Sequence, residues 1–421
     1  MTPARPADPT TPTPVSIPAP TVKSAGWRLP AGTVFPLLAL VLFAFFAAAS
    51  APSPLFVLFQ HQWGFSPALL TVAFAIYALA LLASLLVAGS LSDHIGRRPV
   101  VFVALLLQAA AMLAFLLAQG IGGLIAARIV QGIATGMVSG ALTAAIVEAA
   151  PVSQKRLGAM IGSVSPLAGL AVGALLTGIA VQLASHPVGL VFGVLSVLCV
   201  AAAAATLFIP ETVERRSGAL ASLVPRVSVP RRARGEFLRG LPVTFAVWAL
   251  GGLYLALVPL LIQQVFDVRN GVVNGLAIAA LFGMGSASPT LLRRLSPAAT
   301  GVTGMTAMAV GVALLLLSLN SHSLALFFIG SLVAGFGSGA AFSSQMQTLA
   351  PLTDAHERAE LFAAIYAVSY LFFSVPAMVA GLAVSHAGLL ATAETYTLLL
   401  LLVSASGAWV KWRALQALPR A

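Results

Sequence analysis

The stretch Gly89-Ser-Leu-Ser-Asp93-His-Ile-Gly96-Arg97-Arg98-Pro99 interrupts a part of the chain that is otherwise almost uncharged. No Asp, Glu, Lys or Arg occurs from Leu29 through Ser92, and none occurs again from Pro99 through Ala127. Charged side chains are costly in the hydrocarbon core of a bilayer, so they lie where the chain leaves it. The stretch therefore predicts a loop between two membrane spans.

The composition of the 421 residues excludes a soluble globular protein. Hydrophobic residues make up 59% of the chain and charged residues only 8%, whereas a soluble domain carries about 25% charged residues. The formal net charge is +11, but the basic residues stand in short clusters between apolar runs. That placement is typical of membrane topology and argues against a nucleic-acid partner. With no phosphate-binding loop and a single Cys199, we expect neither an enzyme nor a cofactor.

Apolar runs bounded by charges predict twelve membrane spans, because a helix needs about 20 apolar residues to cross the bilayer. In the first half they lie at about 35–60 and 68–91, within 99–127, at 121–147, and as two within 157–210. In the second half they lie within 240–266 and 270–292, as two within 295–353, and at 360–385 and 389–409. The prediction is an all-α membrane protein.

The spans divide into two six-helix bundles around a central cavity, at 34–210 and 240–412. A basic linker, 211–239, joins them. The Pro/Thr-rich segment 1–33 is expected to be disordered, and 413–421 forms a short tail.

The basic residues predict the orientation of the chain. Every Lys and Arg except Arg128 and Arg269 falls on one side of the predicted membrane. Since cytoplasmic loops carry the excess of basic residues, this side is the cytoplasm, and both termini lie there. We expect a multi-pass protein of the cell (inner) membrane.

Two echoes indicate an internal repeat. A glycine precedes an arginine pair by eight and nine residues at two places 196 residues apart, Gly89 with Arg97-Arg98 and Gly285 with Arg293-Arg294. Ala150-Pro151, with Arg156 after it, and Ala350-Pro351, with Arg358 after it, form the second echo. In the second copy of the loop, Pro289 stands in place of Asp93. Parallel halves with a binding site between them are a known transporter architecture.

The loop resembles the signature between the second and third helices of the major facilitator superfamily, matching it at Gly89, Asp93, Gly96, Arg97 and Arg98. Two further stretches agree, Arg128-Ile-Val-Gln131-Gly132 in the fourth span and Pro210-Glu211-Thr212 after the sixth. The likeness extends from about residue 35 to 412. It implies a twelve-helix transporter whose loop holds the two halves together in the outward-facing state. The alternative is a charged turn with no conformational role.

The residues of the loop also suggest their own chemistry. Glycines permit a tight turn. Asp93 is expected to accept backbone N–H bonds and to complement the positive end of a helix.

Polar residues inside the spans are the candidates for contact with a substrate or coupling ion. Arg128 is the one basic residue expected within a span, and it either has a functional role or extends to water at the membrane surface. The others are Ser50, Ser53, Gln131, Thr135, Trp248, Tyr254 and Gln345. The resemblance implies that their helices line a central cavity. For each, an interhelical hydrogen bond is the alternative.

Ser165-Pro166-Leu-Ala-Gly169 in the fifth span resembles the glycine-proline motif of the superfamily's antiporters, although Ser165 stands where that motif usually has glycine. It favours export, with a plain helix-packing surface as the alternative. No carboxylate lies near the middle of a span, so protons as coupling ion are left open.

The sequence thus predicts a secondary active transporter that moves a small organic solute by alternating access, resembling the drug:proton antiporter branch, and works as a monomer. Export of drug-like or metabolite compounds is the favoured direction. The alternatives are uptake of a nutrient or organic anion, and a non-transporting sensor or scaffold on a transporter fold.

Overall fold

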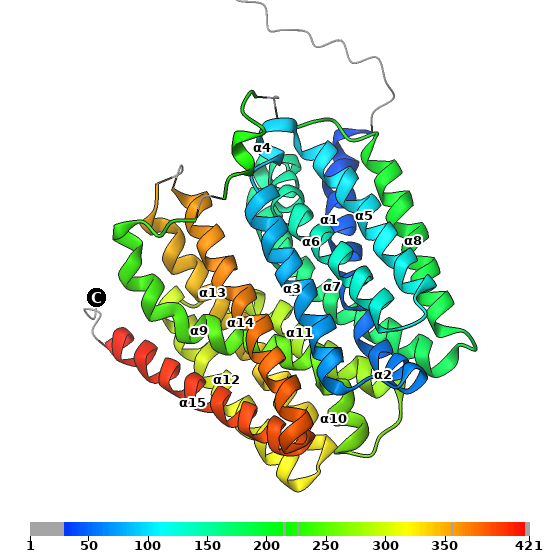
Figure 1. The fold of residues 1–421 in the computed structure, drawn as a ribbon. Coiled ribbons are helices and arrows are strands. Elements are labelled where there is room, and N and C mark those ends of the chain that lie inside the picture. The colour runs from blue at the N-terminus through cyan, green and yellow to red at the C-terminus, as the bar shows by residue number, and fades with distance from the viewer. Residues whose placement is uncertain (1–28, 214–215, 226, 355–356, 417–421) are drawn as a thin grey trace, which may run out of the picture.

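The computed structural model describes residues 29–213, 216–225, 227–354 and 357–416. Over these ranges the chain is helical and contains no strand (Figure 1). The first half comprises α1 (Ala31–Ser50), α2 (Pro52–Trp63), α3 (Pro67–Ala88), α4 (Ser92–Ile95), α5 (Arg97–Leu117), α6 (Ile121–Ala149), α7 (Lys155–Leu183) and α8 (Pro187–Thr206). The second half comprises α9 (Arg231–Ala256), α10 (Val258–Gln264), α11 (Gly271–Leu291), α12 (Pro297–Ser321), α13 (Leu324–Leu349), α14 (Arg358–Ala387) and α15 (Leu389–Gln416). Short 3-10 turns lie at Val152–Gln154, Ala221–Leu223 and Ala350–Leu352.

Within the described residues, twelve helical segments are long and apolar enough to cross a membrane, which confirms the predicted number. The first of them, Gly32–Trp63, contains both α1 and α2. The break between these two helices falls at Pro52, whose missing N–H leaves the Ala48 carbonyl without its helical donor. The first span is therefore one crossing with a local break.

Two helix boundaries differ from the limits of the predicted bundles. α9 begins at Arg231, inside the predicted linker 211–239, and α15 continues to Gln416, beyond 412. Charges mark where a helix leaves the hydrocarbon, but the backbone hydrogen bonds of the helix can continue past that point. Most of the predicted disordered start and the last residues of the tail lie outside the described residues.

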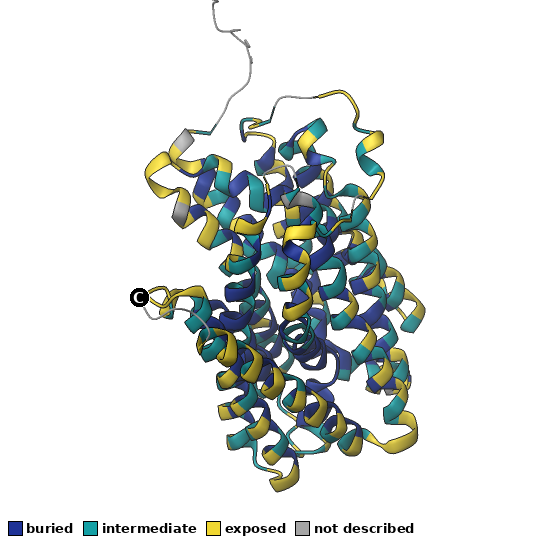
Figure 2. Cartoon of the chain, turned by 90° about the vertical axis from the view of Figure 1, so that its left-hand side faces the viewer, coloured by how far each residue is buried: buried dark blue, intermediate teal, exposed yellow. Residues whose placement is uncertain are grey.

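The outer faces of the bundle expose apolar side chains. Leu117, Leu183 and Val197 are 67%, 78% and 68% exposed, and exposed residues follow the outsides of the helices while buried ones lie between them (Figure 2). Because exposed apolar surface of this extent is unfavourable in water, these faces fit contact with lipid.

The buried core is shared by the two halves at one end and separate at the other. We call the end that carries the loop Gly89–Pro99 and Arg293-Arg294 the basic end, and the opposite one the far end. The largest cluster of buried apolar side chains includes Phe74 of α3 and Phe373 of α14, so it joins both halves. At the basic end, one cluster belongs to the first half alone. A small cluster of the second half, with Leu361 and Ile365, lies apart from it.

Direct contacts between the halves follow the same distribution. At the far end, Gln263 of α10 and His61 of α2 are joined by a hydrogen bond of 2.9 Å between Nε2 atoms. The Gly271 N–H donates to Gln182 Oε1 over 3.1 Å, where α7 and α11 lie side by side (Figure 1). Toward the basic end α7 and α11 still contact each other, but through exposed side chains: Thr290 Oγ1 of α11 donates to Met160 Sδ of α7 over 3.8 Å. The two halves are therefore most firmly joined at the far end.

Candidate functional site

The charged loop is built around a glycine that no other residue could replace without strain. After the single turn of α4, Gly96 has φ 106° and ψ 155°, a region that only glycine adopts readily. A Cβ on Gly96 would also overlap the Glu211 carboxylate. This turn lets α5 start at Arg97 and brings the segment after α8 against it.

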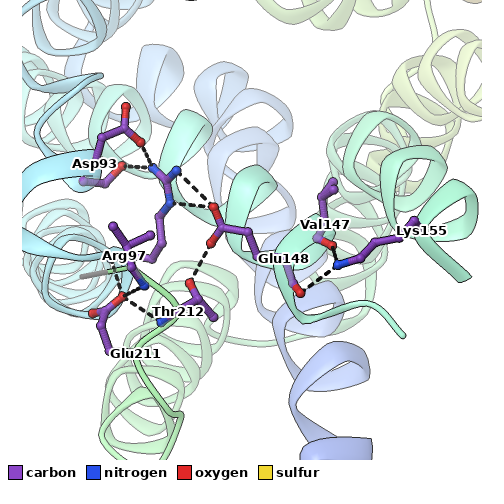
Figure 3. A network of polar contacts seen from close by, with 9 residues as sticks. Asp93, Arg97, Val147, Glu148, Lys155, Glu211 and Thr212 are labelled. Carbon is purple, nitrogen blue, oxygen red and sulfur yellow. Dashed lines mark hydrogen bonds and ion pairs between the residues drawn. The ribbon is translucent and has the colours of Figure 1, made fainter. Parts of the chain in front are cut away.

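Arg97 is the centre of an ion-pair network (Figure 3). Its Nη1 lies 2.5 Å from Asp93 Oδ1 and donates to Ser92 Oγ over 2.6 Å. Its Nη2 lies 3.1 Å from Glu148 Oε1 at the end of α6. The other Glu148 oxygen accepts from Thr212 Oγ1 at 2.6 Å. Arg97 thus joins the loop, α6 and the segment after α8 through groups that are only partly shielded from solvent.

Glu211 binds the first turn of α5. Its two carboxylate oxygens accept from the backbone N–H groups of Arg97 at 2.8 Å and Arg98 at 3.1 Å. Helix N-termini have unpaired N–H donors and a partial positive charge, so a carboxylate stabilises them. Asp93 lies in the first turn of the four-residue helix α4 and pairs with Arg97, whereas Glu211 is the carboxylate that binds the N-terminus of α5. For Arg98 the described contacts include this backbone bond and no side-chain ion pair.

The linker is hydrogen-bonded to the loop at two points. Ser90 Oγ donates to the Ser222 carbonyl over 2.8 Å, and the Arg216 N–H donates to the His94 carbonyl over 2.9 Å. Among the described residues, no hydrogen bond or ion pair joins the loop Gly89–Pro99 to the helices of the second half. In this state the loop is bound to its own half and to the linker.

The second copy of the loop has lost this construction. Pro289 lies within α11, which runs on to Leu291, and Leu292 has φ −93° where Gly96 has a positive φ. Without an acid and without the glycine turn, the copy offers no equivalent of the Arg97 network.

Arg128 is buried and only 1% exposed, so it does not reach water in this state. Its Nη1 donates to Gln131 Oε1 over 2.6 Å. Three aromatic rings surround its guanidinium carbon, with centroids at 4.7 Å for Phe56, 5.3 Å for Tyr77 and 5.6 Å for Phe115. These rings come from α2, α3 and α5, and no sequence pattern indicated them, because the helices are apolar on all sides.

Gln131 links Arg128 to the break in the first span. Its Nε2 donates over 3.1 Å to the Ala48 carbonyl, the group that Pro52 leaves without a helical donor. Close packing of α3 on α6 depends on Gly132, since a Cβ there would overlap the Tyr77 carbonyl. The sequence Arg128…Gln131-Gly132 therefore places a cation, its hydrogen-bond acceptor and a close helix contact within one turn.

The remaining candidates divide into paired and unpaired groups. Tyr254 Oη lies 2.5 Å from Ser331 Oγ, and Gln345 bonds Thr244 at 2.9 Å, both between α9 and α13. Ser50 and Thr135 donate to carbonyls of their own helices. In contrast, the buried Ser53 Oγ and Trp248 Nε1 have no partner among the described residues.

The antiporter-like segment lies on α7 against α1. A Cβ on Gly169 would overlap the Phe43 carbonyl, and Pro166 interrupts the hydrogen bonding of the helix. Ser165 lies one residue before it. These contacts agree with close helix packing, and they leave the link to export a prediction.

The sequence model of the Major Facilitator Superfamily matches residues 38–377. The chain belongs to this superfamily. None of the curated proteins compared with the chain is a significant match. Among solved structures, the chain is similar to the crystal structure of the human organic anion transporter MFSD10 (TETRAN), with 18% sequence identity and a TM-score of 0.64. The match covers 90% of this chain and 99% of that one.

Membership of the Major Facilitator Superfamily confirms the predicted fold class and makes the chain a multi-pass membrane transporter rather than an enzyme. The solved structure, at this level of identity, supports the fold alone. The described residues include no group of three or more His, Cys, Asp or Glu side chains that could hold a metal ion.

Proposed function

We propose that this superfamily member is a secondary active transporter that exports a small organic solute by alternating access. The observation that carries the proposal is the division of the buried core, which both halves share at the far end and which is separate at the basic end. Two halves joined at one end can exchange that closure for closure at the other end. Such an exchange exposes a site between them to each side in turn.

The charged loop is the proposed conformational switch. In the state described, its groups bind within the first half and to the linker. In the opposite state, the loop holds the second half at the basic end. Gly89, Asp93, Gly96, Arg97 and Arg98 form this switch, and the Glu148 and Glu211 carboxylates fix its position.

The proposed orientation puts the basic end and both termini in the cytoplasm of the cell membrane. The positions of Lys and Arg along the chain support it. Closure at the far end then makes the present state inward-facing. We propose a monomer, because each chain contains both halves of the binding site.

The nature and direction of the solute have separate supports. The structural neighbour is described as an organic anion transporter, which favours an organic solute. The segment Ser165-Pro166…Gly169 resembles an antiporter motif and favours export. The described spans hold no carboxylate near mid-depth, so proton coupling would depend on carboxylates at the membrane edge, such as Glu148 at the end of α6.

Flux through proteoliposomes tests this function. Purified protein is reconstituted, a chemically diverse panel of solutes is offered, and uptake into the vesicles is measured with and without an imposed pH gradient. Protein-dependent, saturable flux of at least one organic solute is expected, and a dependence on the gradient would identify protons as the coupling ion. Absence of flux for every solute would favour the sensor or scaffold. Accumulation only in the direction of the cytoplasm would favour uptake.

A further inference from the structure

Arg128 has hydrogen-bond donors that nothing in the described structure uses. Its Nε and Nη2 atoms are buried without a partner, while Nη1 binds the neutral oxygen of Gln131. No Asp or Glu forms an ion pair with it in the described part of the chain. A charge in the membrane interior costs about 2.5–3.5 kcal/mol on insertion scales, which is why such charges are normally paired.

The aromatic rings around Arg128 compensate only in part. A cation–π contact contributes about 0.5–2 kcal/mol and acts on the face of the guanidinium. The N–H donors of a guanidinium point outward in the plane of the group. Rings that lie on its faces therefore do not accept hydrogen bonds from these donors. The free edge of Arg128 therefore lacks an anionic acceptor with oxygen atoms, for which a guanidinium is well suited.

Arg128 lies next to the contact between the two halves. Phe74 of α3 contacts Phe373 of α14 across the halves, with ring centroids 4.9 Å apart. Tyr77 follows Phe74 by three residues and Tyr370 precedes Phe373 by three. Because residues three apart share a helix face and the two helices run antiparallel, both tyrosines lie one turn toward the basic end. The Tyr77 ring, 5.3 Å from the Arg128 guanidinium carbon, thus connects the cation to this contact.

The second half presents an aromatic cluster at the same level. We define it as Trp248, Phe342, Tyr366, Tyr370 and Phe373. The Trp248 ring is central, with centroids 5.0 Å from Tyr370, 5.7 Å from Phe342, 6.0 Å from Phe373 and 6.5 Å from Tyr366. Its Nε1 donor is buried without a partner among the described residues. Such a surface binds flat apolar groups through stacking and edge-to-face contacts.

Along α14, this level is also where the shared core ends. On α14, Tyr370 and Phe373 belong to the core common to both halves, whereas Ile365 and Leu361 belong to the separate cluster of the basic end. A solute that enters between the halves from the basic end would therefore stop against these aromatic rings. The unpaired donors and the rings occur together at that depth.

We infer that the transported solute is an aromatic organic anion whose acid group pairs with Arg128 and whose ring lies against the aromatic cluster. This inference rests on the proposed transport function and specifies its substrate class. The solute itself supplies the counter-ion that Arg128 lacks among the described residues. Because the cation belongs to the first half and the aromatic cluster to the second, only a solute with both parts engages both halves.

Binding to the purified full-length protein tests the inference with three probes. 2-Naphthoate carries both the ring and the charge, 2-naphthamide keeps the ring without the charge, and cyclohexanecarboxylate keeps the charge without the aromatic ring. Binding is measured by thermal stabilisation and by quenching of tryptophan fluorescence. We expect 2-naphthoate to bind about 10- to 100-fold more tightly than either of the others, as loss of one charge-assisted contact predicts. Equal affinity for the acid and the amide, or no saturable binding of 2-naphthoate, would overturn the inference.

Two variants assign the contact to Arg128. Arg128→Gln should lose the preference for the acid over the amide, while Arg128→Lys should keep part of it. The matched control is Arg269→Gln, which removes the same charge from an exposed loop position and should leave the preference intact.

If Arg128→Gln does not fold, Trp248→Phe provides a second test. This substitution removes the unpaired Nε1 donor and the fluorophore next to the proposed position of the ring of the solute. Loss of 2-naphthoate quenching in that folded variant supports the site, and unchanged quenching refutes it.

The same preparation separates this inference from the proposed function. Selective binding of 2-naphthoate without flux in proteoliposomes would refute transport and retain the site. Flux of neutral solutes with no preference for the acid would retain transport and refute the site.

Discussion

At the scale of single residues, Asp93 tests the switch without threatening the fold. Asp93 is 53% exposed, and its partner Arg97 keeps Glu148 and Ser92 when the acid is removed. An exposed ion pair contributes about 0–1 kcal/mol, so Asp93→Asn should leave the melting temperature almost unchanged. Transport should slow severalfold, because the state in which the loop binds the second half loses a partner. Unchanged flux together with unchanged stability would show that Asp93 has no part in the switch.

Glu211 has a different role, and its removal should affect stability. Two backbone N–H groups at the start of α5 depend on its carboxylate. Glu211→Ala should lower the free energy of unfolding by about 1–2 kcal/mol. The loss is smaller than for a buried carboxylate because Glu211 is exposed. Glu211→Gln should cost less, since one amide oxygen still accepts. Thermal unfolding in detergent measures both, with Glu394→Gln as a control for loss of a carboxylate elsewhere. Equal melting temperatures for Glu211→Ala and wild type would contradict the assignment.

Sequence alone drew attention to the loop Gly89–Pro99 and to Arg128, but it did not indicate the side chains that contact them. The loop residues and Arg128 stand out because charges are rare in this chain. Glu211 and Thr212 stand out in the sequence only as part of a motif. The contact of Glu211 with α5 and that of Thr212 with Glu148 of α6 depend on where the chain runs after α8. The rings of Phe56, Tyr77 and Phe115 come from three helices that are apolar all round, so no hydrophobic face revealed which side chains point inward.

At the scale of elements, the turn between α4 and α5 allows a matched comparison of two glycines. Gly96 has φ 106° and ψ 155°, and Gly388 after α14 has φ 81° and ψ 164°. Alanine at either position costs about 1–3 kcal/mol of backbone strain. A Cβ on Gly388 meets nothing within 4 Å, whereas one on Gly96 overlaps the Glu211 carboxylate. Gly96→Ala should therefore lower the melting temperature more than Gly388→Ala and also impair transport. Equal losses of stability would mean that the contact with Glu211 is unimportant.

The helices themselves were predictable because the bilayer imposes their length and excludes charge from them. The break between α1 and α2 follows from Pro52, which lacks a backbone donor. The start of α9 at Arg231 was not predictable from hydropathy, since the first turns of this helix extend beyond its apolar part. Clusters of charged residues thus show where the chain leaves the hydrocarbon core, but they do not show where a helix begins or ends.

At the scale of the whole molecule, the arrangement of the two halves was the least accessible from sequence. The repeat predicted two bundles, but which end joins them depends on contacts such as those of Gln263 with His61. Residues from both halves build one buried core at the far end, and neither half shows this in its own sequence. The state of the transporter is a property of the interface, which depends on a small difference in free energy between two packings.

Covalent closure of the far end should therefore stop transport. In a background with Cys199→Ala, which removes the single cysteine, His61→Cys and Gln263→Cys are combined and joined by a short thiol-specific cross-linker. The halves can then no longer separate at the far end, so solute flux in proteoliposomes should fall to the level of empty vesicles and return after the cross-link is cleaved. Glu236→Cys with Lys411→Cys is the matched control, because that pair lies 3.2 Å apart within the second half and its cross-link should leave flux unchanged. Full flux in the cross-linked His61–Gln263 pair would refute alternating access through separation of the halves at this end.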